Sequence, residues 1–139
     1  FSTLFDFYCP QVREEIFGQT ENSIIISELA VVELYSSLVR KVRTGEISLQ
    51  AQEEAVRNFE EDCAQRFVID PLGSAVLQKV KELLQRYGNT KALRSLDSLQ
   101  LAAGLVARAR GELVFVCADG RLLGVAAAEG VQILNPESS

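Results

Sequence analysis

The sequence contains no histidine, no methionine and no tryptophan, and only three cysteines in 139 residues. Without histidine, Ser-His and Cys-His nucleophile pairs are excluded, so any chemistry must use carboxylates, lysine, arginine or hydroxyls. Cys9, Cys63 and Cys117 form no CxxC spacing, which excludes zinc-finger patterns and argues against a disulfide framework. This cysteine usage fits a reducing, cytoplasmic compartment.

Long apolar runs are also absent, so no stretch of the sequence is expected to span a membrane. Because no methionine is present, we expect the natural chain to begin before Phe1. The remaining composition is that of an ordinary globular domain, with 47% hydrophobic and 24% charged residues. We therefore expect one domain over residues 1–139 that buries a core of its own.

The net charge of −5 argues against a non-enzymatic nucleic-acid binder. Such proteins carry a basic surface, because neutralisation of phosphates dominates their affinity. An enzyme whose acidic side chains hold cations can still act on nucleic acid, since the metal supplies the local positive charge.

Short apolar runs alternate with helical patterns along the chain. Strands are predicted at 24–26, 67–69, 113–117 and 131–134. Helices are predicted after Ser27 and Ser48, which are suited to cap them, and over about 72–87, 96–106 and 121–128. Apolar strands separated by helices imply a parallel sheet covered on both faces. The predicted fold class is therefore an α/β three-layer sandwich with a central parallel sheet.

Three acidic residues lie near the ends of predicted strands or at helix starts, where open parallel sheets gather their ligands. Glu33 lies in the second turn of the helix after the first strand, Asp97 opens an apolar helix, and Asp119 follows the strand at 113–117. An unpaired charge in apolar surroundings is costly, and a shared cation removes that cost. Oxygen ligands without histidine or thiolate suit Mg²⁺ or Mn²⁺.

Each acid also has a simpler structural interpretation. Asp97 could act as a helix cap or dipole partner, and Asp119 before a glycine could be a turn residue. Glu33 has no routine task inside an apolar stripe, although it could pair with Arg40 or Arg94. No single residue decides between structure and chemistry.

Three ordered segments resemble the PIN domain family. They are IIISELAVVELYSSL at 24–38, ALRSLDSLQLAA at 92–103 and VFVCADGRLL at 114–123. The segment GVQILNP at 130–136 is similar to the closing strand of the family. The similarity extends over almost the whole chain and is greatest to VapC-type ribonuclease toxins of VapBC toxin–antitoxin systems.

The resemblance implies that Glu33, Asp97 and Asp119 are catalytic metal ligands, and that Ser2 and Arg94 position substrate or ligands. The segment FSTLFDFY at 1–8 is similar to the part of the family pattern that follows its first acidic ligand. We therefore expect that first acid, and the first strand of the sheet, to lie before Phe1.

The function implied by the resemblance is a Mg²⁺- or Mn²⁺-dependent endoribonuclease, the toxin of a toxin–antitoxin pair. Homodimerisation and an antitoxin protein as partner are implied in the same way. Two alternatives remain. One is a catalytically degenerate PIN-like domain that acts as a binding or regulatory module. The other is a phospho-accepting receiver domain, for which the expected paired acids and late lysine are not visible.

Overall fold

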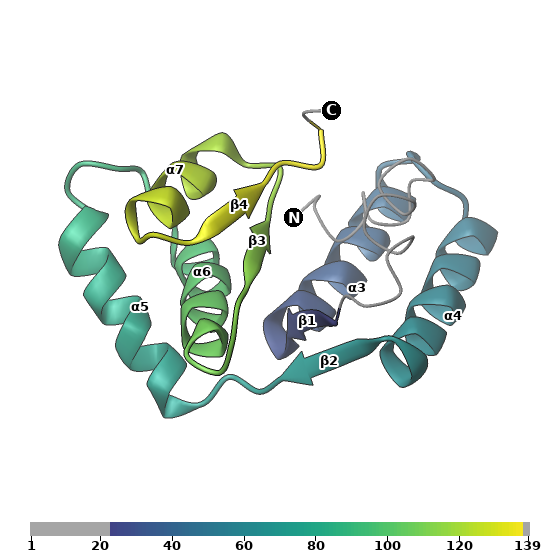
Figure 1. Ribbon diagram of the computed structural model, residues 1–139. Helices are drawn as coiled ribbons and strands as arrows, with labels where there is room; N and C mark the ends of the chain where they lie inside the picture. Colours follow the sequence, from purple (N-terminus) through teal and green to yellow (C-terminus); the bar gives the residue numbers. More distant parts are fainter. Residues whose placement is uncertain (1–22, 138–139) are drawn as a thin grey trace. The chain divides into compact units, whose positions relative to one another are not determined.

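The computed structural model describes residues 23–137 and divides into two compact units, one ending at Asp70 and the other beginning at Pro71 (Figure 1). Both units combine helices with short parallel strands, which confirms the predicted α/β class. Within residues 23–137, no helix is long and apolar enough to cross a membrane.

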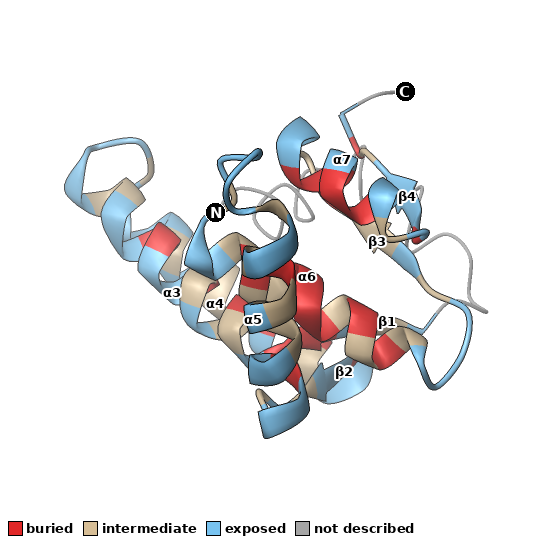
Figure 2. Ribbon diagram, turned by 90° about the vertical axis from the view of Figure 1, so that its left-hand side faces the viewer, coloured by how far each residue is buried: buried red, intermediate tan, exposed pale blue. Residues whose placement is uncertain are grey.

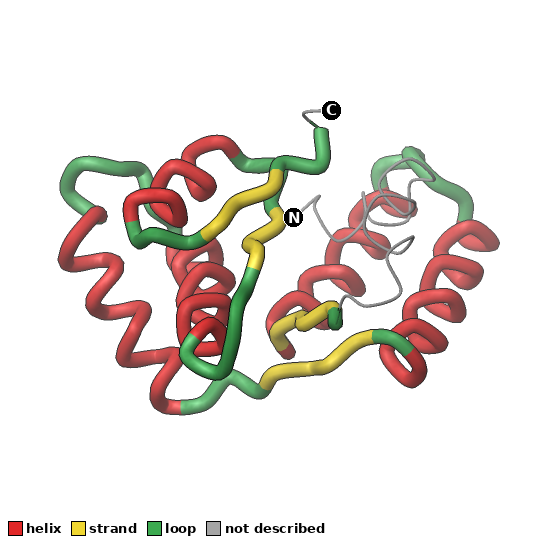
Figure 3. Tube along the Cα trace, viewed as in Figure 1, coloured by secondary structure: helices red, strands yellow, loops and turns green. Residues whose placement is uncertain are grey.

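The N-terminal unit consists of two parallel strands and two helices. In chain order these are β1 (Ile24–Ser27), α3 (Glu28–Arg43), α4 (Leu49–Gln65) and β2 (Phe67–Asp70). β1 and β2, drawn in yellow in Figure 3, pair in parallel, with Ile24 opposite Phe67 and Ser27 opposite Asp70. The carboxyl ends of both strands therefore lie together, and α3 begins at that edge.

The two helices of this unit begin at the serines that the sequence predicts as caps. Ser27 Oγ accepts a hydrogen bond from the Ala30 backbone N–H at 3.1 Å. Ser48 Oγ accepts one from Ala51 N–H at 3.0 Å. Each bond satisfies a backbone donor that has no partner inside the helix. After α3, Gly45 adopts a φ of 77°, a left-handed conformation that favours glycine at helix ends.

Phe59 anchors the core of the N-terminal unit, with only 1% of its surface exposed. Its ring lies 6.3 Å from the Tyr35 ring, edge to face, and 6.1 Å from the Phe67 ring. Leu34 and Leu38 of α3 are buried as well. The opposite face of α4 carries exposed glutamates, namely Glu53, Glu54, Glu60 and Glu61.

The C-terminal unit consists of α5 (Ser74–Tyr87), α6 (Ser95–Arg108), β3 (Val114–Val116), α7 (Gly120–Ala128) and β4 (Gln132–Leu134). β3 and β4 pair in parallel, with Val114 opposite Gln132. The strand predicted over 113–117 is shorter than expected, although the Cys117 N–H still donates to the Leu134 carbonyl at 3.1 Å. Strand ends are often assigned with such a difference of one residue.

α6 is the central helix of this unit, as its apolar sequence predicts. Figure 2 shows buried residues along much of its length, among them Leu101 and Ala102, which are fully buried. At Gly104 a Cβ would come within 3.1 Å of the Phe115 ring, so the glycine permits β3 to approach the helix closely. This packing fixes both the start of α6 and the end of β3, from which the candidate site is built.

The predicted central sheet is present as two parallel pairs, β1–β2 and β3–β4, one in each unit. The assignment of residues 1–139 to a single domain stays a prediction.

Candidate active site

Asp97 lies in the first turn of α6 and is half-buried. This turn is held by Ser98, which is fully buried and donates twice to the Arg94 carbonyl, from Oγ at 2.7 Å and from its backbone N–H at 2.9 Å. The Asp97 carboxylate forms no hydrogen bond or ion pair with any residue of 23–137. Asp97 therefore does not cap α6 with its side chain, and both of its carboxylate oxygens are without a hydrogen-bond partner among residues 23–137.

Asp119 lies between β3 and α7 and is the N-cap of α7. Its Oδ1 accepts hydrogen bonds from the backbone N–H groups of Arg121 at 2.8 Å and Leu122 at 3.3 Å. Its own backbone N–H donates to Cys117 Sγ at 3.3 Å. The structural alternative predicted for Asp119 was a turn residue. In the structure Asp119 caps α7 instead, and the cap uses Oδ1. Among the described residues, Oδ2 has no hydrogen-bond partner.

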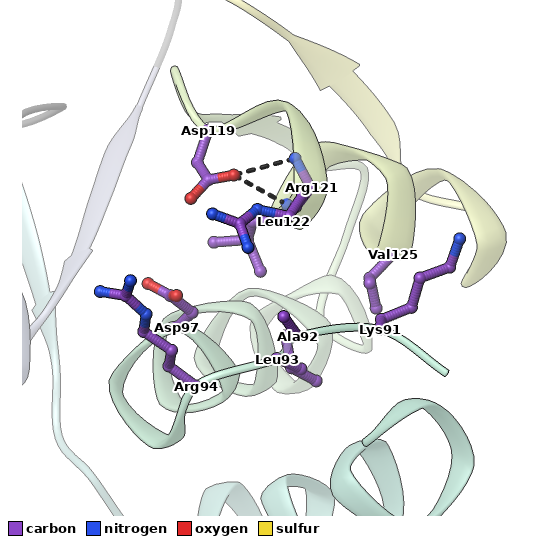
Figure 4. Close-up of a pocket in the computed structure, with 9 residues that line it drawn as sticks. All are labelled: Lys91, Ala92, Leu93, Arg94, Asp97, Asp119, Arg121, Leu122 and Val125. Carbon is purple, nitrogen blue, oxygen red and sulfur yellow. Dashed lines mark hydrogen bonds between the residues drawn. The ribbon is translucent and has the colours of Figure 1, made fainter. Parts of the chain in front are cut away.

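Asp97 and Asp119 line the same small pocket (Figure 4). The pocket lies between the N-terminal ends of α6 and α7 and is open to solvent. Its other lining residues are Lys91, Ala92, Leu93, Arg94, Arg121, Leu122 and Val125. Tertiary packing in the C-terminal unit therefore brings together two of the three acids that the sequence singles out.

The two carboxylates share this pocket with three cationic side chains, those of Lys91, Arg94 and Arg121. No ion pair links any of these three to Asp97 or Asp119. Arg94 was predicted as a positioning residue, and the structure places it in the pocket beside Asp97. Lys91 and Arg121 could not be singled out from the sequence, since neither has neighbours along the chain that give a sign of a site.

Glu33 lies in the second turn of α3, in the N-terminal unit, and is half-buried. Of its apolar neighbours along the chain, Leu34 is buried with 2% exposure, whereas Val32 is 65% exposed. Its role as a further metal ligand stays a prediction. Ser2, the other predicted positioning residue, lies outside the described residues.

The donor set in the pocket fits a hard divalent cation. Mg²⁺ keeps several of its waters and is commonly held by one or two carboxylates together with substrate phosphates. Asp97 and the outer oxygen of Asp119 provide such a pair. Taken alone, neither described unit gathers three or more acidic or cysteine side chains into a cluster that could hold a metal. The pocket thus offers two carboxylates whose chemistry suits such an ion.

A sequence model of the PIN domain matches residues 2–128, a range that includes all residues lining the pocket. No curated protein matches the chain. The matched range also contains Glu33 and Ser2. PIN domains are generally nucleases, which are hydrolases, and they typically use divalent metals such as Mg²⁺. The chain therefore belongs to the PIN domain family.

Proposed function

We propose that this chain is a divalent-metal-dependent endoribonuclease. The observation that carries the proposal is that Asp97 of α6 and Asp119, the N-cap of α7, line one pocket. Membership of a family of nucleases gives the pocket its reaction class, which is phosphodiester hydrolysis. The cations in the same pocket suit a polyanionic substrate.

Mg²⁺ or Mn²⁺ would be held by Asp97 and Asp119, with Glu33 as a further ligand. A divalent ion bound there supplies Lewis acidity and positive charge for attack of water on the phosphodiester. Asp119 suits this role because its Oδ1 is fixed by two backbone donors, which orients Oδ2. Asp97 suits it because the bonds from Ser98 to the Arg94 carbonyl hold the first turn of α6.

Arg94 and Ser2 would position the substrate around this centre. Arg94 precedes α6 and shares the pocket with Asp97, so its guanidinium can hold a phosphate close to the carboxylates. It also offsets part of the negative charge of the two acids before a metal binds. Ser2 keeps the positioning role that the family resemblance implies.

The Asp97→Asn variant tests this proposal. We expect it to lower the rate of Mg²⁺-dependent RNA cleavage by about 100-fold or more, because a ligand charge at the reacting centre is lost. Mn²⁺ affinity measured by calorimetry should fall as well, which gives a readout independent of turnover. The matched control is Glu112→Gln, an exposed acid of the same unit outside the pocket. Equal activity of the Asp97→Asn and unaltered chains would refute the assignment.

A catalytically degenerate PIN-like binding module is the second candidate. It is favoured by the observation that only two carboxylates share the pocket within the C-terminal unit. This candidate predicts no divalent-ion binding in the millimolar range and no RNA cleavage under any metal condition. A Mn²⁺ titration followed by calorimetry separates it from the nuclease proposal.

The cellular role we propose is that of a toxin in a toxin–antitoxin pair, with a homodimer as the active form and an antitoxin as its inhibitor. The support is the similarity of the segments at 24–38, 92–103 and 114–123 to VapC-type toxins. Expression of the chain in a bacterial host should then arrest growth, and Asp97→Asn should relieve the arrest. Normal growth on expression of an active nuclease would reject the toxin role while leaving the nuclease proposal intact.

A further inference from the structure

The pocket carries more positive than negative charge, although the chain as a whole has a net charge of −5. Its three cations are Lys91, Arg94 and Arg121, and its two acids are Asp97 and Asp119. Among residues 23–137, none of the three cations forms an ion pair. Their charge is therefore available to a ligand.

Some other cations of residues 23–137 are paired with acidic side chains. Lys79 pairs with Glu82 at 2.7 Å, and Arg86 pairs with Glu129 at 2.6 Å. These pairs join positions on the protein itself, so they contribute to its structure. The three pocket cations form no such pair although two carboxylates line the same pocket, which makes them candidates for binding a ligand.

Arg121 and Lys91 lie at opposite ends of the pocket lining. Figure 4 shows the Arg121 guanidinium extending toward the side on which Asp97 and Asp119 lie, whereas the Lys91 amino group lies at the far end, near Val125. Arg121 belongs to the first turn of α7, and Lys91 to the loop that precedes α6. The two charges therefore flank the pocket from separate elements.

This arrangement matches a single-stranded RNA backbone, which carries one negative charge at each phosphate. The carboxylates alone would repel such a strand, so a nuclease with this pocket needs cations that attract the phosphates around the reacting bond. A guanidinium can donate two parallel hydrogen bonds to one phosphate, and an ammonium acts as a compact point charge.

We propose that Arg121 and Lys91 form a phosphate-binding rim, in which Arg121 contacts the reacting phosphodiester and Lys91 contacts a neighbouring phosphate of the same strand. The inference rests on the proposed nuclease function for the choice of RNA as ligand. It adds two substrate-binding residues to the site and gives each a different place on the strand.

The rim is tested by RNA binding in the Asp97→Asn background, in which cleavage does not interfere. Lys91→Gln and Arg121→Gln are compared with Lys81→Gln, an exposed lysine of α5 that lies outside the pocket. A labelled single-stranded RNA is titrated at several salt concentrations. Loss of one phosphate contact should weaken binding by about 3- to 10-fold and reduce the slope of log K against log salt by about 0.7. Lys81→Gln should change neither quantity.

The charge-conserving variants Lys91→Arg and Arg121→Lys distinguish phosphate binding from a structural role. Lys91→Arg should restore affinity and salt slope, since any cation can serve a flanking phosphate. Arg121→Lys should restore the slope of log K against log salt, because the positive charge is kept. In the chain that retains Asp97, however, cleavage by Arg121→Lys should stay slow, because lysine cannot donate the two parallel hydrogen bonds. In that same chain, Lys91→Gln should raise KM with kcat unchanged, and Arg121→Gln should lower kcat.

The proposed rim is contradicted if Lys91→Gln and Arg121→Gln bind RNA with the same affinity and the same salt slope as their Asp97→Asn parent. A parent that binds no RNA would overturn it equally. If instead the proposed nuclease function is wrong, the unaltered chain should still bind RNA through the rim but should not cleave it in the presence of Mg²⁺. The two failures are therefore distinguishable in one set of measurements.

Discussion

At the scale of single residues, Asp119 combines two tasks that involve different oxygens. Oδ1 caps α7 through the backbone N–H groups of Arg121 and Leu122, and Oδ2 stays open toward the pocket. The cap stabilises the helix and at the same time restricts the rotation of the carboxylate. A single side chain thus links the stability of α7 to the geometry of the proposed metal site.

Substitutions of Asp119 should separate these tasks. Asp119→Asn should leave the free energy of unfolding within a few tenths of a kcal/mol, because asparagine is an equally good cap. Asp119→Ala should lower it by about 1 kcal/mol through loss of the cap. Both variants should lose RNA cleavage, since neither carries the carboxylate charge. Chemical denaturation and a cleavage assay measure the two effects.

The control for this pair is Ser48→Ala, which removes a cap of the same kind from α4. It should destabilise the chain without a specific loss of cleavage. An Asp119→Asn variant that cleaves RNA at the normal rate would show that this carboxylate serves only as a cap.

At the scale of helices and strands, Glu129 ties the end of α7 to α5. Its carboxylate accepts hydrogen bonds from Arg86 Nη1 and Tyr87 Oη, both at 2.6 Å. Its backbone carbonyl accepts one from Arg108 Nη1 of α6 at 3.1 Å. Three helices therefore meet at one residue, next to Gly130, which has a φ of 80° and turns the chain toward β4. This junction supports the packing that places Asp97 and Asp119 in one pocket.

Because of the contacts of Glu129, the free energy of unfolding should depend on pH in the acid range. Burial by itself raises the pKa of Glu129, but the hydrogen bonds from Tyr87 and Arg86 outweigh it, so the pKa lies below its ordinary value. A lowered pKa stabilises the fold above the unfolded-state pKa of about 4.5, and this contribution is lost as the pH falls through the folded-state value. Glu129→Gln should therefore cost about 1 kcal/mol at pH 7 and progressively less below about pH 4.5.

Urea denaturation of Glu129→Gln and of the unaltered chain at several pH values measures this effect. Glu112→Gln serves again as the control, because its side chain is exposed and lies outside the junction. A destabilisation of the same size at neutral and acid pH would contradict an electrostatic role for Glu129.

At the scale of the whole molecule, the absence of histidine leaves no side chain that ordinarily titrates near neutral pH. The groups with shifted pKa values lie away from neutrality. A hydrogen bond from Thr44 and the charge of Lys41 lower the pKa of Glu46, while burial raises the pKa values of Cys63 and Tyr35. The lowered pKa of Glu46 affects stability at acid pH, and the raised pKa values of Cys63 and Tyr35 affect it at alkaline pH.

The free energy of unfolding should therefore be nearly constant between about pH 6 and pH 7.5. It should decrease at acid pH and again above about pH 9, where the Cys63 thiol ionises in the unfolded state before it does in the folded state. Denaturation at a series of pH values measures this profile. Any change of RNA cleavage between pH 6 and 7.5 then reports the reacting centre rather than unfolding. A marked change of stability in that interval would contradict the expectation.

Much of the local structure could be predicted from the sequence, because it depends on neighbouring residues. Ser27 and Ser48 cap their helices as expected, and the apolar stripe of α6 correctly indicated a central helix. Asp97 could be singled out because it opens an apolar helix, and Asp119 because it follows the strand predicted at 113–117. The sequence did not show which oxygen of Asp119 the cap occupies, since that depends on the turn formed after β3.

What the sequence by itself determined was therefore the order and type of the elements, the caps at Ser27 and Ser48, and the acids near a helix start and a strand end. Only the tertiary structure decided that Asp97 and Asp119 share a pocket, that Lys91 and Arg121 flank it, and that Arg86 and Tyr87 meet Glu129. The physical reason is the range of the interactions. Caps and hydrophobic periodicity act within a few residues along the chain, whereas the pocket arises from the packing of α6 against β3 and α7.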